Sequence, residues 1–121
     1  MDDINDFAAF GEKLADASGK IILSYWRSQL EVIRKSDESP VTRADREAEK
    51  KIRELIETEY PHHGISGEEF GNVRLDAEYI WSLDPIDGTK AFISGSPLFG
   101  TLIALLKNGA PIMGIINIPA T

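Results

Sequence analysis

The segment WSLDPIDGTKAF, residues 81–92, leads from an apolar run directly into two aspartates, Asp84 and Asp87. Carboxylates at the end of a buried strand are costly to desolvate unless a cation or hydrogen-bond donors accompany them. Pro85 interrupts strand pairing and turns the chain, which can direct both carboxylates toward one point. Hard divalent cations such as Mg²⁺ bind carboxylate oxygens together with phosphate oxygens. The segment therefore predicts a magnesium site that also takes phosphate.

Residues around these aspartates extend the prediction. Gly88 lets the backbone approach a ligand closely, and the N–H and hydroxyl of Thr89 suit an anion if a helical turn opens there. A second acidic pair, Glu68 and Glu69, follows a short strand-like run and a glycine, and Asp45 falls in the first turn of a predicted helix. These acidic positions, at strand ends and a helix start, can converge on one site, where two metals hold the attacking and leaving oxygens.

Simpler interpretations exist for several of these residues. Glu68 and Glu69 alone are typical of a solvated loop, and Asp45 alone suits the dipole at a helix start. His62 and His63 are expected in an exposed turn. Three aromatic side chains are expected to pack in the interior: Tyr25, Trp26 and Trp81. For Asp-Pro-Ile-Asp-Gly-Thr, however, a purely structural explanation accounts for the proline and glycine but not for two aspartates.

Other motifs with paired aspartates fit less well. An EF-hand loop beginning at Asp84 would need a glutamate at its twelfth position, which is Gly95. The haloacid dehalogenase-like phosphatases carry D-x-D-G-T, with one residue between the aspartates. Here two residues intervene, which in a regular strand turns the second aspartate to the opposite face. The Walker phosphate-binding pattern is absent from the sequence.

Composition narrows the range of partners and compartments. The net charge of −7 repels nucleic acid and anionic membranes, so neither is an expected partner. Metal cations would allow such an acidic protein to bind a phosphorylated substrate. The absence of cysteine excludes disulfides and thiolate metal sites. The N-terminus lacks an apolar signal core and no apolar run has membrane-spanning length, so we expect a cytoplasmic protein.

The length suits one domain, residues 1–121, and the order of the predicted elements suggests a layered α+β or α/β architecture with two long helices packed on a sheet. The helices are expected over residues 3–29 and from Thr42 to Tyr60. Residues 88–97 are expected to form a turn or short helix with a loop, and residues 36–40 a polar loop. Strands are expected in 30–35, at the start of 63–72, in 79–85, and as a pair within 100–120 around a turn at 107–109.

WSLDPIDGTKAF resembles the first signature of the inositol monophosphatase-like family, which comprises Mg²⁺-dependent, lithium-sensitive phosphatases. The GEE triplet lies upstream in the order that the family shows, and PVTRAD resembles its V-T-x-x-D segment. The resemblance covers nearly the whole chain, and GTKAFISGSPLFGTLIALL is most similar to the bacterial branch of histidinol-phosphatases and inositol monophosphatases. It implies the α+β class and layered α/β sandwich of that family, with long N-terminal helices packed on a largely antiparallel sheet.

The resemblance also implies metal ligands. Glu68, Asp84 and the carbonyl of Ile86 would bind one Mg²⁺, and Asp84 and Asp87 would bind another. Two or three Mg²⁺ ions are implied, with Mn²⁺ as a possible substitute. Glu69 would act behind these ligands, by orienting one of them.

Further roles follow from the same resemblance. Asp87, Gly88 and Thr89 would hold the substrate phosphate, the last two through backbone N–H groups. Thr89, assisted by Asp45, would orient and activate the attacking water. Lys35 matches a lysine in a loop of the family.

The implied reaction is hydrolysis of a small phosphorylated alcohol by in-line attack of water, without a phosphoenzyme. Inositol monophosphate and histidinol phosphate are rival substrates, and FISGSP favours the second by resemblance. A homodimer and inhibition by lithium are also implied.

The family's second signature, W-D-x-A-A-G, which supplies a further metal ligand, is absent. We therefore expect the chain to be the N-terminal portion of a phosphatase, with the C-terminal half absent. The alternative is a catalytically incomplete chain that acts only as a metal-binding or assembly half. An exposed sheet face or edge at IINIPA predicts self-association.

Overall fold

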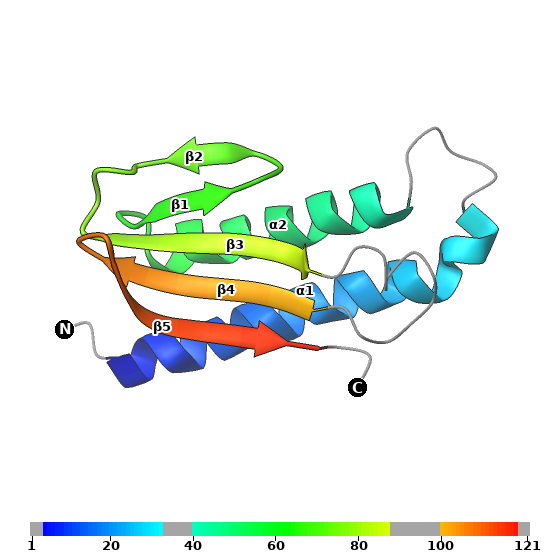
Figure 1. Ribbon diagram of the computed structural model, residues 1–121, viewed down its shortest axis with the longest axis horizontal. Helices are drawn as coiled ribbons and strands as arrows, with labels where there is room; N and C mark the ends of the chain where they lie inside the picture. The colour runs from blue at the N-terminus through cyan, green and yellow to red at the C-terminus, as the bar shows by residue number, and fades with distance from the viewer. Residues whose placement is uncertain (1–3, 33–39, 88–99, 119–121) are drawn as a thin grey trace.

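The computed structural model describes residues 4–32, 40–87 and 100–118, with side chains described over 4–25, 43–84 and 101–118. Two helices cover one face of a five-stranded sheet (Figure 1). The helices are α1 (Ile4–Val32) and α2 (Pro40–Glu59). The strands are β1 (Gly64–Gly67), β2 (Gly71–Val73), β3 (Tyr79–Asp87), β4 (Gly100–Lys107) and β5 (Ala110–Asn117).

The strand order in the sheet is β2-β1-β3-β4-β5. β1 and β3 run parallel, and the other neighbouring pairs are antiparallel. The parallel pair arises because a long connection containing β2 returns the chain to the start of β3, whereas β4 and β5 are joined by a hairpin. The predicted α+β class with a largely antiparallel sheet is confirmed.

The hairpin between β4 and β5 turns through Asn108 and Gly109, which both have positive φ, 50° and 84°. A two-residue Asn-Gly turn with this conformation matches the right-handed twist of the flanking strands. The predicted turn at residues 107–109 is therefore confirmed, and Lys107 is the last residue of β4.

The core lies between the helices and the sheet. Alternation along β3 and β4 places every second side chain against the helices, while α1 and α2 contribute one apolar face each. Aromatic rings fill one end of this core, where Phe7 and Phe10 of α1 meet Trp81 of β3. The buried cluster comprises Phe7, Phe10, Leu14, Ala15, Ile52, Ile56, Ile65, Trp81, Leu83, Ile103 and Leu105.

His63 corrects one prediction. His62 is exposed, as expected of a turn, but only 6% of His63 is exposed. Its ring stacks on Tyr60, with centroids 4.5 Å apart and an interplanar angle of 3°. Its Nδ1 atom accepts a hydrogen bond from Trp81 Nε1 at 3.0 Å. His63 is therefore a structural residue of the core, and Trp81 is the buried packing residue that the sequence predicts.

The element boundaries correct further predictions. α1 continues to Val32, so residues 30–32 are helical and not part of a strand, while residues 33–35 lie outside the described ranges. α2 begins at Pro40, two residues before the predicted start, because proline fits the first turn of a helix. The short edge strand β2 was not predicted. No helix in the described ranges is both long and apolar enough to cross a membrane.

Candidate active site

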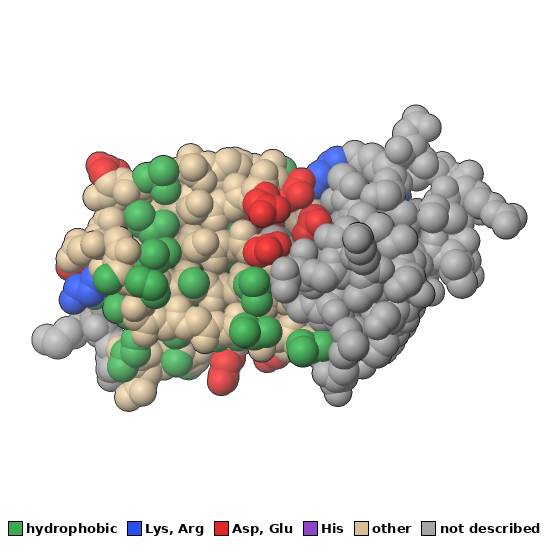
Figure 2. Space-filling model, viewed as in Figure 1, with side chains coloured by type: hydrophobic (Ala, Val, Ile, Leu, Met, Phe, Trp, Pro, Cys, Tyr) green, Lys and Arg blue, Asp and Glu red, His purple; other side chains and the backbone are tan. Residues whose placement is uncertain are grey.

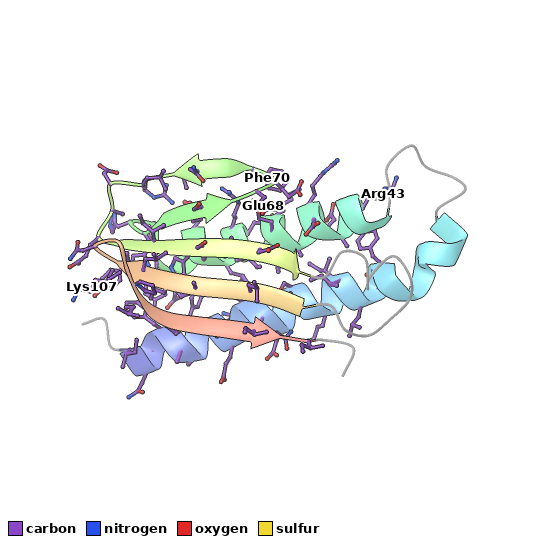
Figure 3. The ribbon with its side chains drawn as sticks, viewed as in Figure 1. Arg43, Glu68, Phe70 and Lys107 are labelled. Carbon is purple, nitrogen blue, oxygen red and sulfur yellow. The ribbon has the colours of Figure 1, made fainter. Side chains whose placement is uncertain are left out.

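Parallel pairing of β1 and β3 brings the two acidic segments to one edge of the sheet. Gly67, the last residue of β1, pairs with Leu83 of β3. Glu68 directly follows Gly67 at the end of β1, and Asp84 directly follows Leu83 within β3, so the two residues lie at the same level of two adjacent parallel strands. Figure 3 labels Glu68 at this end of the sheet and Lys107 at the opposite end. The predicted convergence of these two positions is therefore a property of the fold.

β3 contains an irregularity between its two aspartates. Asp84 pairs with Leu102 and Asp87 with Gly100, so three steps along β3 face two steps along β4. This register shift is that of a β-bulge, in which one extra residue is accommodated on one strand. Positions 84 and 87 thus pair with residues that are two apart on β4. In a regular strand, two intervening residues would turn the second aspartate to the opposite face of the sheet. That argument against a D-x-D type of motif does not hold for this bulged strand.

Asp84 belongs to the sheet face that points away from the helices. Its neighbour Leu83 is 4% exposed and packs in the core, and successive residues of a strand point to opposite faces. Asp84 is half-buried and lines a groove of about 450 Å³ on that outer face. Leu102, Ala104 and Ile116 also line this groove, so the carboxylate lies at one end of an apolar surface.

Figure 2 looks onto this outer face. Acidic side chains gather where β1 and β3 end, beside the part of the chain that is not described. This local excess of negative charge favours a cation over an anion.

Asp45 is carried to the same end by α2. The helix runs antiparallel to β1, because a short turn joins its C-terminal end to the start of that strand. Its N-terminal half therefore lies toward the ends of β1 and β3 (Figure 1). Asp45 is half-buried and is the sixth residue of the helix, so the prediction that it falls in the first turn is wrong. The first turn of α2 contains no acidic residue.

The turn after β1 carries Glu68 and Glu69, and both side chains are exposed. The backbone N–H groups of Glu69 and Phe70 donate to the carboxylate of Glu49, at 3.2 and 3.0 Å. Sequence analysis missed Glu49, which is fully buried. Its helical spacing from Ile52 and Ile56 placed it on the apolar face of α2, and that position is the signal that could have identified it.

Several predicted site residues lie partly or wholly outside the described residues. The backbone of Ile86 and Asp87 lies in β3, but their side chains are outside the described set. Lys35, Gly88 and Thr89 lie outside the described residues altogether. Among the side chains that are described, no three His, Asp or Glu residues are grouped closely enough to hold a metal ion. A carboxylate pair from Glu68 and Asp84 suits Mg²⁺ in donor type, and a full ligand set requires residues beyond the described side chains.

The architecture, with two helices on one face of a mixed five-stranded sheet, is that of a layered α+β protein. A model of the inositol monophosphatase family matches residues 3–121. The chain belongs to the inositol monophosphatase family.

Individual relatives agree with this assignment. The chain is 50% identical over 119 residues to the bifunctional phosphatase IMPL2, chloroplastic, of Arabidopsis thaliana, covering 97% of this chain and 34% of that protein. It is 47% identical to a histidinol-phosphatase of Chlorobaculum parvum, covering 89% of this chain and 42% of that protein.

Among solved structures, an inositol monophosphatase from Zymomonas mobilis superimposes with a TM-score of 0.83 at 47% identity, covering 98% of this chain and 46% of that one. The chain thus spans less than half the length of these relatives.

Proposed function

We propose that this chain forms the metal- and phosphate-binding half, residues 1–121, of a Mg²⁺-dependent phosphomonoesterase. The parallel pairing of Gly67 with Leu83 carries the proposal, because it brings Glu68 and Asp84 to one edge of the sheet. Inositol monophosphatases depend on Mg²⁺ in general. Oxygen ligands from carboxylates are the ligands that this ion prefers.

In this proposal the ligand set is Glu68, Asp84, Asp87 and the carbonyl of Ile86. The pairing of positions 84 and 87 with Leu102 and Gly100 supports it, since those partners are two residues apart on one strand. Glu69 would orient one of these ligands. Two or three Mg²⁺ ions, or Mn²⁺ in their place, would offset the negative charge of the site and of the phosphate. Bound Mg²⁺ supplies Lewis acidity toward phosphoryl oxygens and makes water more acidic.

The residues of the chain then bind and orient the reactants. The backbone N–H groups of Gly88 and Thr89 would hold the phosphate, and the Thr89 hydroxyl, assisted by Asp45, would direct a water for in-line attack. Positioning and fixed charge would supply most of the rate, as in other phosphoryl transfers. Lys35, in the segment between α1 and α2, would add a positive charge near the site.

The substrate would be a small phosphorylated alcohol. Histidinol phosphate is the first compound to test, because a relative named histidinol-phosphatase is 47% identical to this chain. Inositol monophosphate is the second, because the superimposed structure at 47% identity is named an inositol monophosphatase. Nucleic acid and membrane are not partners in this proposal, the compartment is the cytoplasm, and the assembly is a homodimer.

The alternative is a catalytically incomplete chain that acts only as a metal-binding or assembly half, since the chain spans 34% and 42% of two phosphatases that it matches. Phosphate release distinguishes the two. We would assay the 121-residue chain and its extended gene product on both substrates, with Mg²⁺ and with EDTA. Mg²⁺-dependent release by either protein supports the phosphatase, and the preferred substrate identifies the branch. No release by either would leave the non-catalytic role.

A further inference from the structure

The carboxylate of Glu49 is a buried charge in α2 that no step of the proposed reaction uses. The residue is 0% exposed. One carboxylate oxygen accepts a bond from Arg53 Nε at 3.0 Å and from the backbone N–H of Phe70 at 3.0 Å, and the other accepts from the N–H of Glu69 at 3.2 Å. These three donors offset the desolvation of a carboxylate, which would otherwise be severe.

The two backbone donors belong to the turn between β1 and β2. The paired residues of these strands end at Gly67 and begin again at Gly71, so Glu69 and Phe70 lie outside the ladder. Buried or half-buried N–H groups outside a ladder need another acceptor. Glu49 supplies it from a different element, 20 and 21 residues earlier in the chain.

Gly67 lets this carboxylate approach the strand end. A Cβ atom at position 67 would lie 2.6 Å from the Glu49 carboxylate carbon and from one of its oxygens. Such a distance is far inside van der Waals contact, so an unsubstituted Cα is required for the observed approach.

Arg53 fixes the other end of the turn. It lies one helical turn after Glu49 and donates to the carbonyl of Gly71 as well as to Glu49. Its guanidinium carbon lies 5.8 Å from the centroid of the Phe70 ring. The Glu49–Arg53 ion pair therefore contacts the turn on both sides of Glu69, through Gly67 and through Gly71.

These contacts flank Glu68 in the sequence. It lies between Gly67, where a Cβ atom would clash with the Glu49 carboxylate, and Glu69, whose N–H donates to that carboxylate. Figure 3 shows Glu68 and Phe70 next to each other at the end of β1, over α2. Asp45 lies four residues before Glu49 on the same helix, about 6 Å along its axis. One helix thus carries both a candidate site residue and the support of the turn.

We propose that Glu49 is a positioning residue whose buried carboxylate holds the Glu68–Phe70 turn and so fixes the Glu68 carboxylate where it binds Mg²⁺. The metal role of Glu68 rests on the proposed function. Partners that orient metal ligands typically change metal affinity 10- to 100-fold when they are removed.

The test is Glu49→Gln in the complete gene product. Glutamine keeps the shape, but it loses one acceptor oxygen and presents an NH₂ group toward backbone donors. The matched control is Glu54→Gln, the same change on an exposed residue of the same helix. Mg²⁺ dissociation constants come from calorimetry on the folded proteins. Amide hydrogen exchange of the 68–71 segment is measured without metal.

We expect Glu49→Gln to raise the Mg²⁺ dissociation constant about 10- to 100-fold and to speed exchange in the 68–71 segment, with Glu54→Gln equal to the unaltered protein in both. Unchanged Mg²⁺ affinity in Glu49→Gln would overturn the inference even if exchange increased, because the residue would then be structural only. Weaker affinity without faster exchange would overturn it too. If Glu49→Gln does not fold, the second variant is Arg53→Lys, which keeps the positive charge but loses the forked guanidinium. Arg53→Lys should raise the Mg²⁺ dissociation constant by a smaller factor. An unchanged dissociation constant in Arg53→Lys would overturn the inference.

The proposed function has its own readout in this experiment. An unaltered protein that binds no Mg²⁺ would refute the metal site itself, and the inference with it. An unaltered protein that binds Mg²⁺ equally well with Glu49→Gln would refute the inference alone.

Discussion

The indole Nε1 of Trp81 donates a hydrogen bond to Nδ1 of His63 at 3.0 Å, between two side chains that are 0% and 6% exposed. His63 lies just before β1 and Trp81 lies within β3, so the bond links β3, which contains Asp84, to the start of the parallel strand that Glu68 follows. A buried side-chain hydrogen bond between neighbouring strands helps to fix their register, and the relative level of those two acidic positions depends on that register.

Removal of either partner of this bond should destabilise the fold. Trp81→Phe and His63→Phe each leave a buried polar atom without this partner, which costs about 1–3 kcal/mol of unfolding free energy. The double substitution should cost less than the sum, with a coupling of about 0.5–3 kcal/mol. Urea denaturation of the four proteins measures it. His62→Phe, at an exposed position, is the control and should shift stability by less than about 0.5 kcal/mol. Strict additivity would contradict the role given to the bond.

Gly67→Ala should destabilise the chain because its Cβ would lie 2.6 Å from the buried Glu49 carboxylate. Overpacking of this kind costs about 1–3 kcal/mol. Gly114→Ala is the matched control, since a Cβ there meets nothing within 4 Å. Chemical denaturation of both variants compares them. Equal stability of the two would mean that the turn shifts freely away from α2.

Much of this fold could be predicted because its long elements are strongly periodic. α1, α2 and the β4–β5 hairpin follow from apolar spacing and from the Asn108-Gly109 turn. Two of the wrong predictions concern a short strand, β2, and the C-terminal end of α1. β2 has three residues with mostly exposed side chains, so it shows no alternation that a sequence could reveal. The apolar residues of LEV favour a strand locally, but they continue the last turn of α1.

The sequence alone nominates residues for the candidate site, but it does not reveal their geometry. Two aspartates around a proline identify Asp84 and Asp87 as unusual residues. Their position relative to Glu68 depends on the parallel pairing of β1 with β3. Because β2 lies between these two strands in the sequence, no local pattern encodes their pairing. Glu49 was missed among the acidic residues of ADREAEKK, although its spacing from Ile52 and Ile56 places it on the apolar face of α2. Its contact with the 68–70 turn is tertiary, and no local pattern encodes that contact.

Asp87→Asn should abolish Mg²⁺-dependent phosphate release in the complete gene product while leaving the fold largely intact. The neutral amide is a poor ligand for a hard cation, and the change removes one negative charge from the site without changing the side-chain size. Phosphate release at saturating Mg²⁺ and far-UV circular dichroism measure the two effects. Near-normal turnover of Asp87→Asn would refute the assignment of Asp87 to the metal site.

The outer face of the sheet should promote self-association of the 121-residue chain. β5 is an edge strand, and Ile116 beside the Asp84 groove is 75% exposed, with Ile112 and Ile118 37% and 41% exposed. Exposed apolar surface next to an open strand edge favours pairing with another copy. Ile116→Ser should weaken self-association at least about tenfold, since burial of an isoleucine contributes about 1.5–3 kcal/mol. Sedimentation velocity over a concentration series measures this, with Ile4→Ser, at a 46% exposed isoleucine of α1, as the matched control. If both variants associate as the unaltered chain does, the outer face is not the contact surface.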